Sequence, residues 1–207
     1  MNHCDRNEVL HPTRMDLPPE IRRYVIQLLN QTLACTVDLR SHVKQAGWNV
    51  RGQDFASLQA LFATMASELD AYADLMAERI AVLGGIARGT APTAAMQSRV
   101  AESPDTLVDG HAHVLALAER LAPYARAMRG GIALAADVED AGTAAVYTDL
   151  SRGVDKQLWV LEAHLNRSGV SAAPKSHVGR TEESRRCRSV TSESTNGAGS
   201  VGTPHND

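Results

Sequence analysis

Four stretches of the chain place hydrophobic residues every three or four positions, which is the period of an α-helix with one buried face. These stretches cover about residues 18–46, 54–83, 107–134 and 137–166. The second shows the stripe most clearly, with apolar residues at Phe55, Leu58, Leu61, Phe62, Met65, Leu69, Tyr72, Met76, Ile80 and Leu83. The pattern therefore predicts an all-α domain of four long helices.

Local signals predict where these helices begin and end. Pro18-Pro19 open the first helix, because proline is tolerated in a first turn. Residues 47–52 contain two glycines and an asparagine, which accept positive φ, so we expect a loop there. Asp54 is the predicted N-cap of the second helix, and Gly84-Gly85 close its C-terminus.

The longest predicted connection, residues 84–105, separates the second helix from the third. It contains glycine and two prolines, and a short helical piece from Ala94 to Glu102 is expected within it. A crossover of this length lets the second and third helices run in the same direction. Inside the third helix, Pro123 predicts a kink or a local bend.

Composition agrees with closely packed helices. Hydrophobic residues make up 43% of the 207 residues and aromatic residues only 4%, which favours helices over a sheet. The net charge is −3 at pH 7 and the pI is near 6.2, which argues against a generally basic nucleic-acid-binding surface. A local basic patch remains compatible with these values. No run of residues is long and apolar enough to suggest a membrane span.

The three cysteines, Cys4, Cys35 and Cys187, are scattered and form no CxxC or Cys/His metal spacing. We therefore expect no disulfide framework and a reducing cytosol. Cys35 falls on the apolar stripe of the first helix, where it fits a small buried hydrophobe. The N-terminus has no uninterrupted apolar core of the signal-peptide type, so the sequence favours a cytoplasmic location.

Polar segments flank the predicted helical domain of residues 17–166. Residues 1–16 are expected to form a flexible arm without net positive charge, in which His3 and His11 have no metal role. The tail, residues 167–207, is rich in Ser, Thr and Gly, which predicts disorder. Its candidate DNA-binding residues are Lys175, Arg180, Arg185, Arg186 and Arg188. Two interpretations stay open: a solvated tail, or non-specific contact with DNA phosphates.

Several titratable side chains are candidates for chemistry. Asp70, Asp74 and Glu78 are four residues apart, so they lie along one strip of the second helix. Taken alone, such a strip is most often a solvated face or a set of ion-pair partners. His111 and His113 are two residues apart on the third helix, so they point away from each other. We interpret both as surface or interface groups rather than metal ligands.

Two long motifs occur in a fixed order along the chain. The first is Lys44-Gln45-Ala46-Gly47-Trp48-Asn49-Val50-Arg51-Gly52, followed by Asp74-Leu75-Met76-Ala77-Glu78-Arg79, and the second is Ser151-Arg152-Gly153-Val154-Asp155-Lys156-Gln157-Leu158-Trp159-Val160-Leu161-Glu162-Ala163-His164-Leu165. Together they resemble the Dps family, the DNA-binding proteins from starved cells, over roughly residues 17–166. The resemblance implies a ferritin-like four-helix bundle with a long crossover between helices two and three. It further implies a dodecameric, homo-oligomeric cage in the cytoplasm or nucleoid that stores iron and contacts DNA without sequence preference.

The resemblance also implies a di-iron site shared by two subunits, and here the chain departs from the family. One family subunit supplies two histidines and an aspartate, whose positions in this chain are Gly47, Gln59 and Ala63. The other subunit supplies an Asp-x-x-x-Glu pair, which is kept as Asp74 and Glu78. Gly47 and Ala63 carry no donor atom, whereas iron at such a site prefers imidazole and carboxylate ligands. The remaining carboxylates are therefore expected to hold iron only weakly.

A second departure concerns cation entry. In the family, an acidic three-fold pore includes an aspartate whose position here is Ala145, while Asp140 and Asp149 remain. We expect cation entry through such a pore to be weakened. His42 is on a different helical face from Gly47, so it is not expected to replace the lost imidazole.

Two functions follow from the resemblance and its departures. The first is a cage that sequesters iron and protects DNA under starvation or oxidative stress, with ferroxidase activity lost or weak. The alternative is an active ferroxidase that oxidises Fe(II) with hydrogen peroxide and stores ferric mineral. Whether the chain is an enzyme stays open on the sequence alone.

Overall fold

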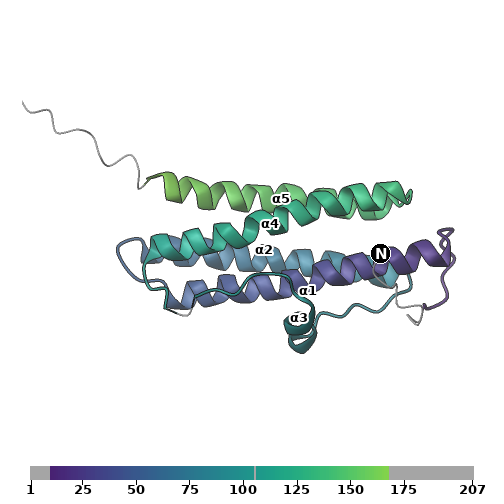
Figure 1. Ribbon diagram of the computed structural model, residues 1–207, viewed down its shortest axis with the longest axis horizontal. Helices are drawn as coiled ribbons and strands as arrows, with labels where there is room; N and C mark the ends of the chain where they lie inside the picture. Colours follow the sequence, from purple (N-terminus) through teal and green to yellow (C-terminus); the bar gives the residue numbers. More distant parts are fainter. Residues whose placement is uncertain (1–9, 105, 168–207) are drawn as a thin grey trace, which may run out of the picture. The chain divides into compact units, whose positions relative to one another are not determined.

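The computed structural model describes residues 10–104 and 106–167. Within them lie five helices: α1 (Pro19–Asn49), α2 (Phe55–Val82), α3 (Ala91–Gln97), α4 (Gly110–Asp137) and α5 (Ala141–Arg167) (Figure 1). The described residues contain no strand, and their one isolated β-bridge joins Arg51 to Asp109. The predicted all-α class is confirmed. Cys4, Cys187, His3 and the basic residues of the tail lie outside the described residues.

The four long helices form two pairs. α1 packs along α2, and α4 packs along α5, as Figure 1 shows. The pairs contact each other through α1 against α4 and α2 against α5, and the short helix α3 packs on α1 within the crossover. The predicted four-helix bundle and the long connection between the second and third long helices are both confirmed.

A single apolar core runs between the helices. Its largest fully buried side chains are Tyr147, Phe62, Ile26, Leu29, Leu39, Met65, Leu69, Met76, Ile80, Leu83, Leu121 and Met128. Most of these positions belong to the stripes that the sequence predicts. Burial of this apolar surface is the main force holding the two helix pairs together.

Two hydroxyl pairs cross this core between α1 and the second helix pair. Thr32 Oγ1 lies 2.8 Å from Tyr147 Oη, and Thr36 Oγ1 lies 2.6 Å from Tyr124 Oη. Each threonine donates its own proton to a carbonyl one turn earlier in α1, so each tyrosine donates to its threonine. Burial raises the pKa of both tyrosines, and both stay neutral donors.

The prediction of a loop over residues 47–52 is wrong for residues 47–49, because α1 continues through Asn49. The amide of Val50 donates to the Ala46 carbonyl, so the helical hydrogen bonds continue past Gly47. The Asn49 side chain also donates to the carbonyl of Gln45, one turn earlier. In this region only Gly52 has a positive φ, at 109°, so the true turn is shorter than the glycine spacing suggests.

The ends of α2 agree better with the sequence. Asp54 is the N-cap residue, but its side chain makes no capping bond; its backbone carbonyl accepts from Leu58 N and Ser57 Oγ instead. At the other end, Gly84 has φ of 82°, a conformation that favours glycine. The amide of His11 donates to the Gly84 carbonyl, so the described part of the predicted arm lies against this end of α2.

The helical piece of the crossover is shifted from the prediction, since α3 covers Ala91–Gln97 rather than Ala94 to Glu102. Pro92 lies in its first turn, which fits the preference of proline for that position. Residues 98–104 beyond it are not helical, and Arg120, buried on α4, binds two of their carbonyls. Arg120 donates to Ala101 O at 2.8 Å and also contacts Glu102 O.

α4 begins at Gly110, later than the predicted residue 107, and runs without interruption through Pro123. Asp109 caps it by accepting a hydrogen bond from Ala112 N. Val108 and Leu115, which the sequence places in the apolar stripe, are exposed, while Val114 is buried. Gly110 lies on the same inward face as Val114 and Leu117, and a β-carbon there would lie 2.6 Å from Leu58 Cδ1.

α5 spans Ala141–Arg167 rather than Asp137 to Asn166, because Glu139, with φ of 58°, breaks the chain direction after α4. Cys35, expected to be buried, is only half-buried, and its sulfur accepts from Arg99 N and Gln31 Nε2. Among residues 10–104 and 106–167, no helix combines the length and the apolar content that a membrane span requires.

Candidate functional site

The positions singled out by the sequence share one exposed strip of α2. Gln59, Ala63, Asp74 and Glu78 are all exposed. Asp74 lies eleven positions after Ala63, which is about three helical turns, so all four residues lie on the same side of the helix. At 1.5 Å per residue the two halves of the strip are about 16 Å apart within one chain. A site that uses both halves therefore needs a second chain.

Gly47 belongs with the first half of the strip. A β-carbon built on Gly47 would lie 3.6 Å from the β-carbon of Phe62, an ordinary contact. Phe62 immediately precedes Ala63 and lies close to Gln59 along α2. The structure thus brings Gly47, Gln59 and Ala63 to one end of the α1–α2 pair.

This first half of the site has no chemistry suited to iron. Gly47 and Ala63 present no donor atom, and the amide of Gln59 is neutral. Among the described residues, no group of three or more His, Cys, Asp or Glu side chains is placed to hold a metal ion. The residues present do not fit a complete di-iron site within this chain.

The second half keeps its carboxylates. Asp74 and Glu78 are one helical turn apart and exposed, and neither forms an ion pair with another described residue. Asp70, the third acid of the predicted strip, is instead paired with Arg40 of α1. Two free carboxylates on one face can contact a cation together with water, but they leave most of its coordination unfilled.

A buried ion pair fixes this half of the strip against α5. Arg79, directly after Glu78, donates to Asp140 Oδ1 at 2.6 Å and to Thr143 Oγ1 at 3.0 Å. Asp140 also accepts from the amide and the hydroxyl of Thr143, which caps α5. The sequence gives a partial signal for this contact, because an aspartate before a helical pattern is a candidate N-cap, but it does not indicate Arg79 as the partner.

The histidines occupy a different part of the fold from the strip. His42 is on α1, and its side chain contacts the crossover, where its Nδ1 is 3.0 Å from Ser103 Oγ. His111 is exposed, as predicted, but His113 is 6% exposed, so its interpretation as a surface group is wrong. His113 is buried because it lies on the inner face of α4 with Val114 and Leu117. Burial lowers the pKa of His113, opposed by a hydrogen bond to the Leu107 backbone and by the charge of Asp109.

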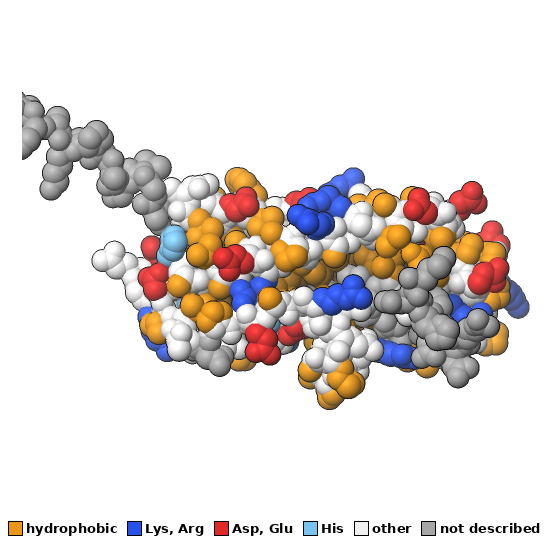
Figure 2. All heavy atoms as spheres, in the orientation of Figure 1, with side chains coloured by type: hydrophobic (Ala, Val, Ile, Leu, Met, Phe, Trp, Pro, Cys, Tyr) orange, Lys and Arg blue, Asp and Glu red, His pale blue; other side chains and the backbone are white. Residues whose placement is uncertain are grey.

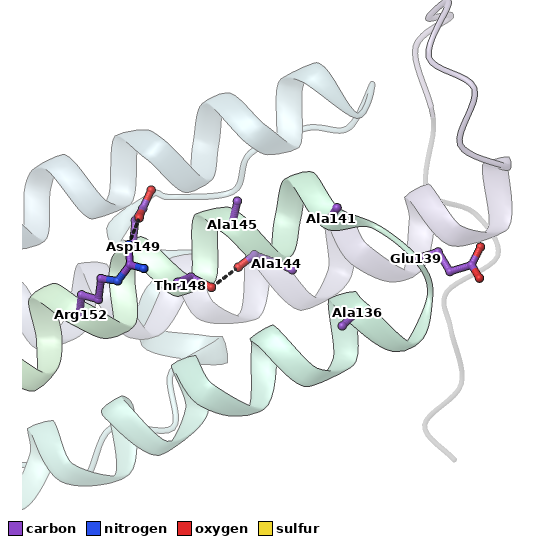
Figure 3. Close-up of a pocket in the computed structure, with 8 residues that line it drawn as sticks. All are labelled: Ala136, Glu139, Ala141, Ala144, Ala145, Thr148, Asp149 and Arg152. Carbon is purple, nitrogen blue, oxygen red and sulfur yellow. Dashed lines mark hydrogen bonds and ion pairs between the residues drawn. The ribbon is translucent and has the colours of Figure 1, made fainter.

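An open hollow of about 580 Å³ lies at the turn between α4 and α5. Figure 3 shows the residues that line it. Ala145 lines it, together with Ala136, Glu139, Ala141, Ala144, Thr148, Asp149 and Arg152. Asp149 is paired with Arg152 at 3.2 Å on the exposed side of this hollow. Asp140 is not among its residues, because Asp140 is buried against Arg79. Of the two acids that remain from the predicted pore, Asp149 therefore lines this hollow and Asp140 does not.

Comparison with known proteins identifies the family of this fold. A family model for the ferritin-like domain matches residues 26–168. The chain is 37% identical over 155 residues to the DNA protection during starvation protein of Agrobacterium fabrum, covering 75% of this chain and 96% of that one. The chain belongs to the Dps family of ferritin-like proteins.

Solved Dps structures agree with this assignment. DpsC from Streptomyces coelicolor matches with a TM-score of 0.72 and 27% identity over 76% of this chain and 92% of its own. Dps from Microbacterium arborescens, solved in its high iron form, matches with a TM-score of 0.67 and 28% identity over 72% of this chain and 97% of its own. The predicted Dps resemblance is confirmed.

Proposed function

We propose that this chain forms a cytoplasmic, dodecameric Dps cage that sequesters iron and protects DNA, with ferroxidase chemistry between subunits lost or weak. The observation that supports it is the composition of the exposed strip. Gly47, Gln59 and Ala63 supply no imidazole and no carboxylate, while Asp74 and Glu78 keep theirs. A ferroxidase must hold two ferrous ions close together, which needs several fixed donors from both chains.

Exposed apolar side chains support assembly. Trp48 is 69% exposed beside Gly47, and Phe55 is 44% exposed at the start of α2. Trp159 on α5 is 65% exposed. Large aromatic side chains left open on a folded chain commonly mark contacts with another chain. Figure 2 shows other apolar side chains exposed among charged ones along one face of the bundle.

Iron and DNA enter the proposal through the relatives. The Agrobacterium fabrum relative is named for DNA protection during starvation, and the Microbacterium arborescens structure is a high iron form. Acidic groups such as Asp74 and Glu78 can concentrate cations and start mineral growth without a complete di-iron site. Slow mineralisation is therefore compatible with a degenerate site.

A second candidate is an active ferroxidase, and the retained pair favours it. Asp74 and Glu78 are exposed, unpaired within the described residues and fixed in place through Arg79. A second cage subunit carrying the two histidines and the aspartate would complete a site against them. In that case activity would depend on mixed assembly rather than on this chain alone.

Rebuilding the missing half tests the proposal. In the variant Gly47→His, Gln59→His, Ala63→Asp, the early rate of Fe(II) oxidation by hydrogen peroxide should rise roughly tenfold or more, because imidazole and carboxylate groups that can bind iron return. The backbone permits the change: a β-carbon at Gly47 meets Phe62 at 3.6 Å, and Gln59 and Ala63 are exposed. The measurement is anaerobic mixing of apo-protein with Fe(II) and peroxide, followed by absorbance.

The matched control adds Asp74→Asn and Glu78→Gln to the rebuilt variant, which should return the rate to that of the unmodified chain. The unmodified chain should barely exceed iron in buffer at early times. A fast, saturable phase in the unmodified chain would contradict the proposal, because it would require ligands other than these five positions.

A further inference from the structure

A small, partly open cavity lies between three elements, and no residue of the exposed α2 strip lines it. Its volume is about 20 Å³, room for a single water molecule or a single metal ion. Side chains with nitrogen or oxygen donors line it from each element: His42 and Gln45 from α1, Ser103 from the crossover, and His113 from α4. Pro104, Leu107, Ala46, Ala116 and Leu117 complete the wall.

His113 supplies the first indication that this cavity binds a ligand. The side chain is more than nine-tenths buried, yet its Nε2 has no hydrogen-bond partner among the described residues. The hydrogen bond to the Leu107 backbone must therefore use Nδ1, as the donor to the carbonyl. Nε2 is then left with a free lone pair. A histidine that donates one ring N–H to a backbone carbonyl and presents the other nitrogen is arranged as metal-binding histidines are.

His42 has a matching arrangement on the opposite wall. Its Nδ1 lies 3.0 Å from Ser103 Oγ, and its Nε2 lies 3.6 Å from Asp38 Oδ1. If Nδ1 binds a cation beside Ser103, the N–H at Nε2 points to the Asp38 carboxylate. Carboxylate partners of this kind orient ligating histidines and strengthen them as donors. Both imidazoles thus already have the outer partners that a metal site uses.

We propose that this cavity binds one divalent cation that prefers imidazole, of the Zn²⁺ type, through His113 and His42. Ser103 and Gln45 or a water molecule would supply the remaining oxygen donors. Two imidazoles with oxygen donors suit zinc and its neighbours in the transition series better than magnesium or calcium, which prefer all-oxygen sites. The carboxylates of Asp38 and Asp109, one beside each histidine, offset the charge of the cation.

The proposed site has a structural consequence, because its donors come from α1, α4 and the crossover. A bound cation would join the crossover to both helices, next to the place where Arg120 already holds its carbonyls. Metal binding would therefore stabilise the folded chain, since the ligands are not assembled in the unfolded one. This role is separate from iron oxidation at the α2 strip.

Titration of the full-length protein with Zn²⁺ and with Co²⁺ tests the site. The test variants are His113→Gln and His42→Gln, and the control is His111→Gln, an exposed histidine two residues from His113 on the same helix. The unmodified chain and His111→Gln should bind one more Zn²⁺ per chain than the two test variants. Binding of that ion should weaken at least about tenfold in each test variant. Bound Co²⁺ should show the visible absorption of nitrogen ligation, which a carboxylate pair alone does not give.

Thermal unfolding supplies a second measurement. Zn²⁺ should raise the Tm of the unmodified chain and of His111→Gln, and it should leave the Tm of His42→Gln unchanged. Mg²⁺ should not raise the Tm of any of the three proteins. His42 is less deeply buried than His113, with 14% of its side chain exposed, so His42→Gln carries the test if His113→Gln does not fold. The proposal is overturned if the unmodified chain binds no more Zn²⁺ than His42→Gln does, because the cavity then holds water only.

Discussion

Asp140 positions the carboxylate strip of α2 without belonging to it. It is 2% exposed, and its oxygens accept from Arg79 and from the amide and hydroxyl of Thr143. Because Arg79 follows Glu78 directly, this one acid both starts α5 and fixes the last turns of α2. Asp140, which the sequence suggested for a pore, is thus buried and paired with Arg79.

Asp140→Ala should lower the free energy of unfolding by roughly 3–5 kcal/mol, since it leaves the buried end of Arg79 without its partner. The matched control is Asp149→Ala, which removes an exposed pair with Arg152 and should cost less than about 1 kcal/mol. Urea unfolding of the three proteins measures the difference. Equal losses in the two variants would contradict a structural role for the buried pair.

At the scale of a helix, the contact between α4 and α5 depends on one glycine. A β-carbon on Gly131 would lie 2.5 Å from ring atoms of Tyr147, whereas one on Gly130 would meet nothing within 4 Å. Tyr147 is fully buried and bound to Thr32, so its ring has little freedom to move away. The close approach of the two helices therefore requires glycine at position 131 and not at 130.

Gly131→Ala should destabilise the chain by about 1–3 kcal/mol through overpacking. Gly130→Ala, its neighbour on the same helix, should instead stabilise the chain by up to about 1 kcal/mol, because alanine is the better helix former. Denaturant midpoints of both variants give the comparison. If Gly131→Ala were as stable as Gly130→Ala, the packing of Tyr147 against α4 would be looser than described.

Much of this helical architecture could be predicted from the sequence, because the stripe of α2 and the two motifs are long and regular. Helix ends were harder: Gly47 suggested a turn, but it lies inside α1, since its neighbours supply unbroken hydrogen bonds. The predicted stripe of α4 is wrong at Leu115, because the buried face runs through Val114, Leu117 and Leu121 instead. Such contacts between distant segments leave no local periodic signal.

The candidate site was predictable in part for the same reason. The positions Gly47, Gln59, Ala63, Asp74 and Glu78 follow from the motifs; the last four lie on one exposed strip of α2, and Gly47 lies on α1 against Phe62. The burial of His113 was not predictable, because a spacing of two residues says only that two side chains differ in direction. That His113 faces inward depends on how α4 packs against α1 and the crossover.

At the scale of the whole molecule, the two separated halves of the strip call for assembly. We expect the purified full-length protein to form a particle of about twelve chains of 22.2 kDa each, because homo-oligomers close by symmetry and the exposed tryptophans need partners. Size-exclusion chromatography with light scattering measures the mass. A stable monomer at micromolar concentration would contradict the cage.

DNA contact is predicted to depend on the tail, whose basic residues lie outside the described residues. Deleting residues 168–207 should remove most DNA binding, and binding by the full chain should fall steeply as salt rises, because phosphate contacts release counterions. Gel-shift titration at several salt concentrations measures both effects.

A full-length control isolates charge from length. Arg185→Gln, Arg186→Gln and Arg188→Gln together should make the slope of log affinity against log salt shallower by up to about 3. A truncated cage that shifts DNA as well as the full-length protein does would place the contact elsewhere.

The hydroxyl pairs between α1 and the tyrosines also determine the register of the two helix pairs. A slide of α1 by one turn keeps the same helix face inward. After such a slide, one tyrosine would still meet a threonine, but the other would face Leu28 or Arg40. One buried hydroxyl would then lose its partner, at a cost of about 1–3 kcal/mol. Thr32 and Thr36 therefore help to set how the α1–α2 pair is aligned along the α4–α5 pair.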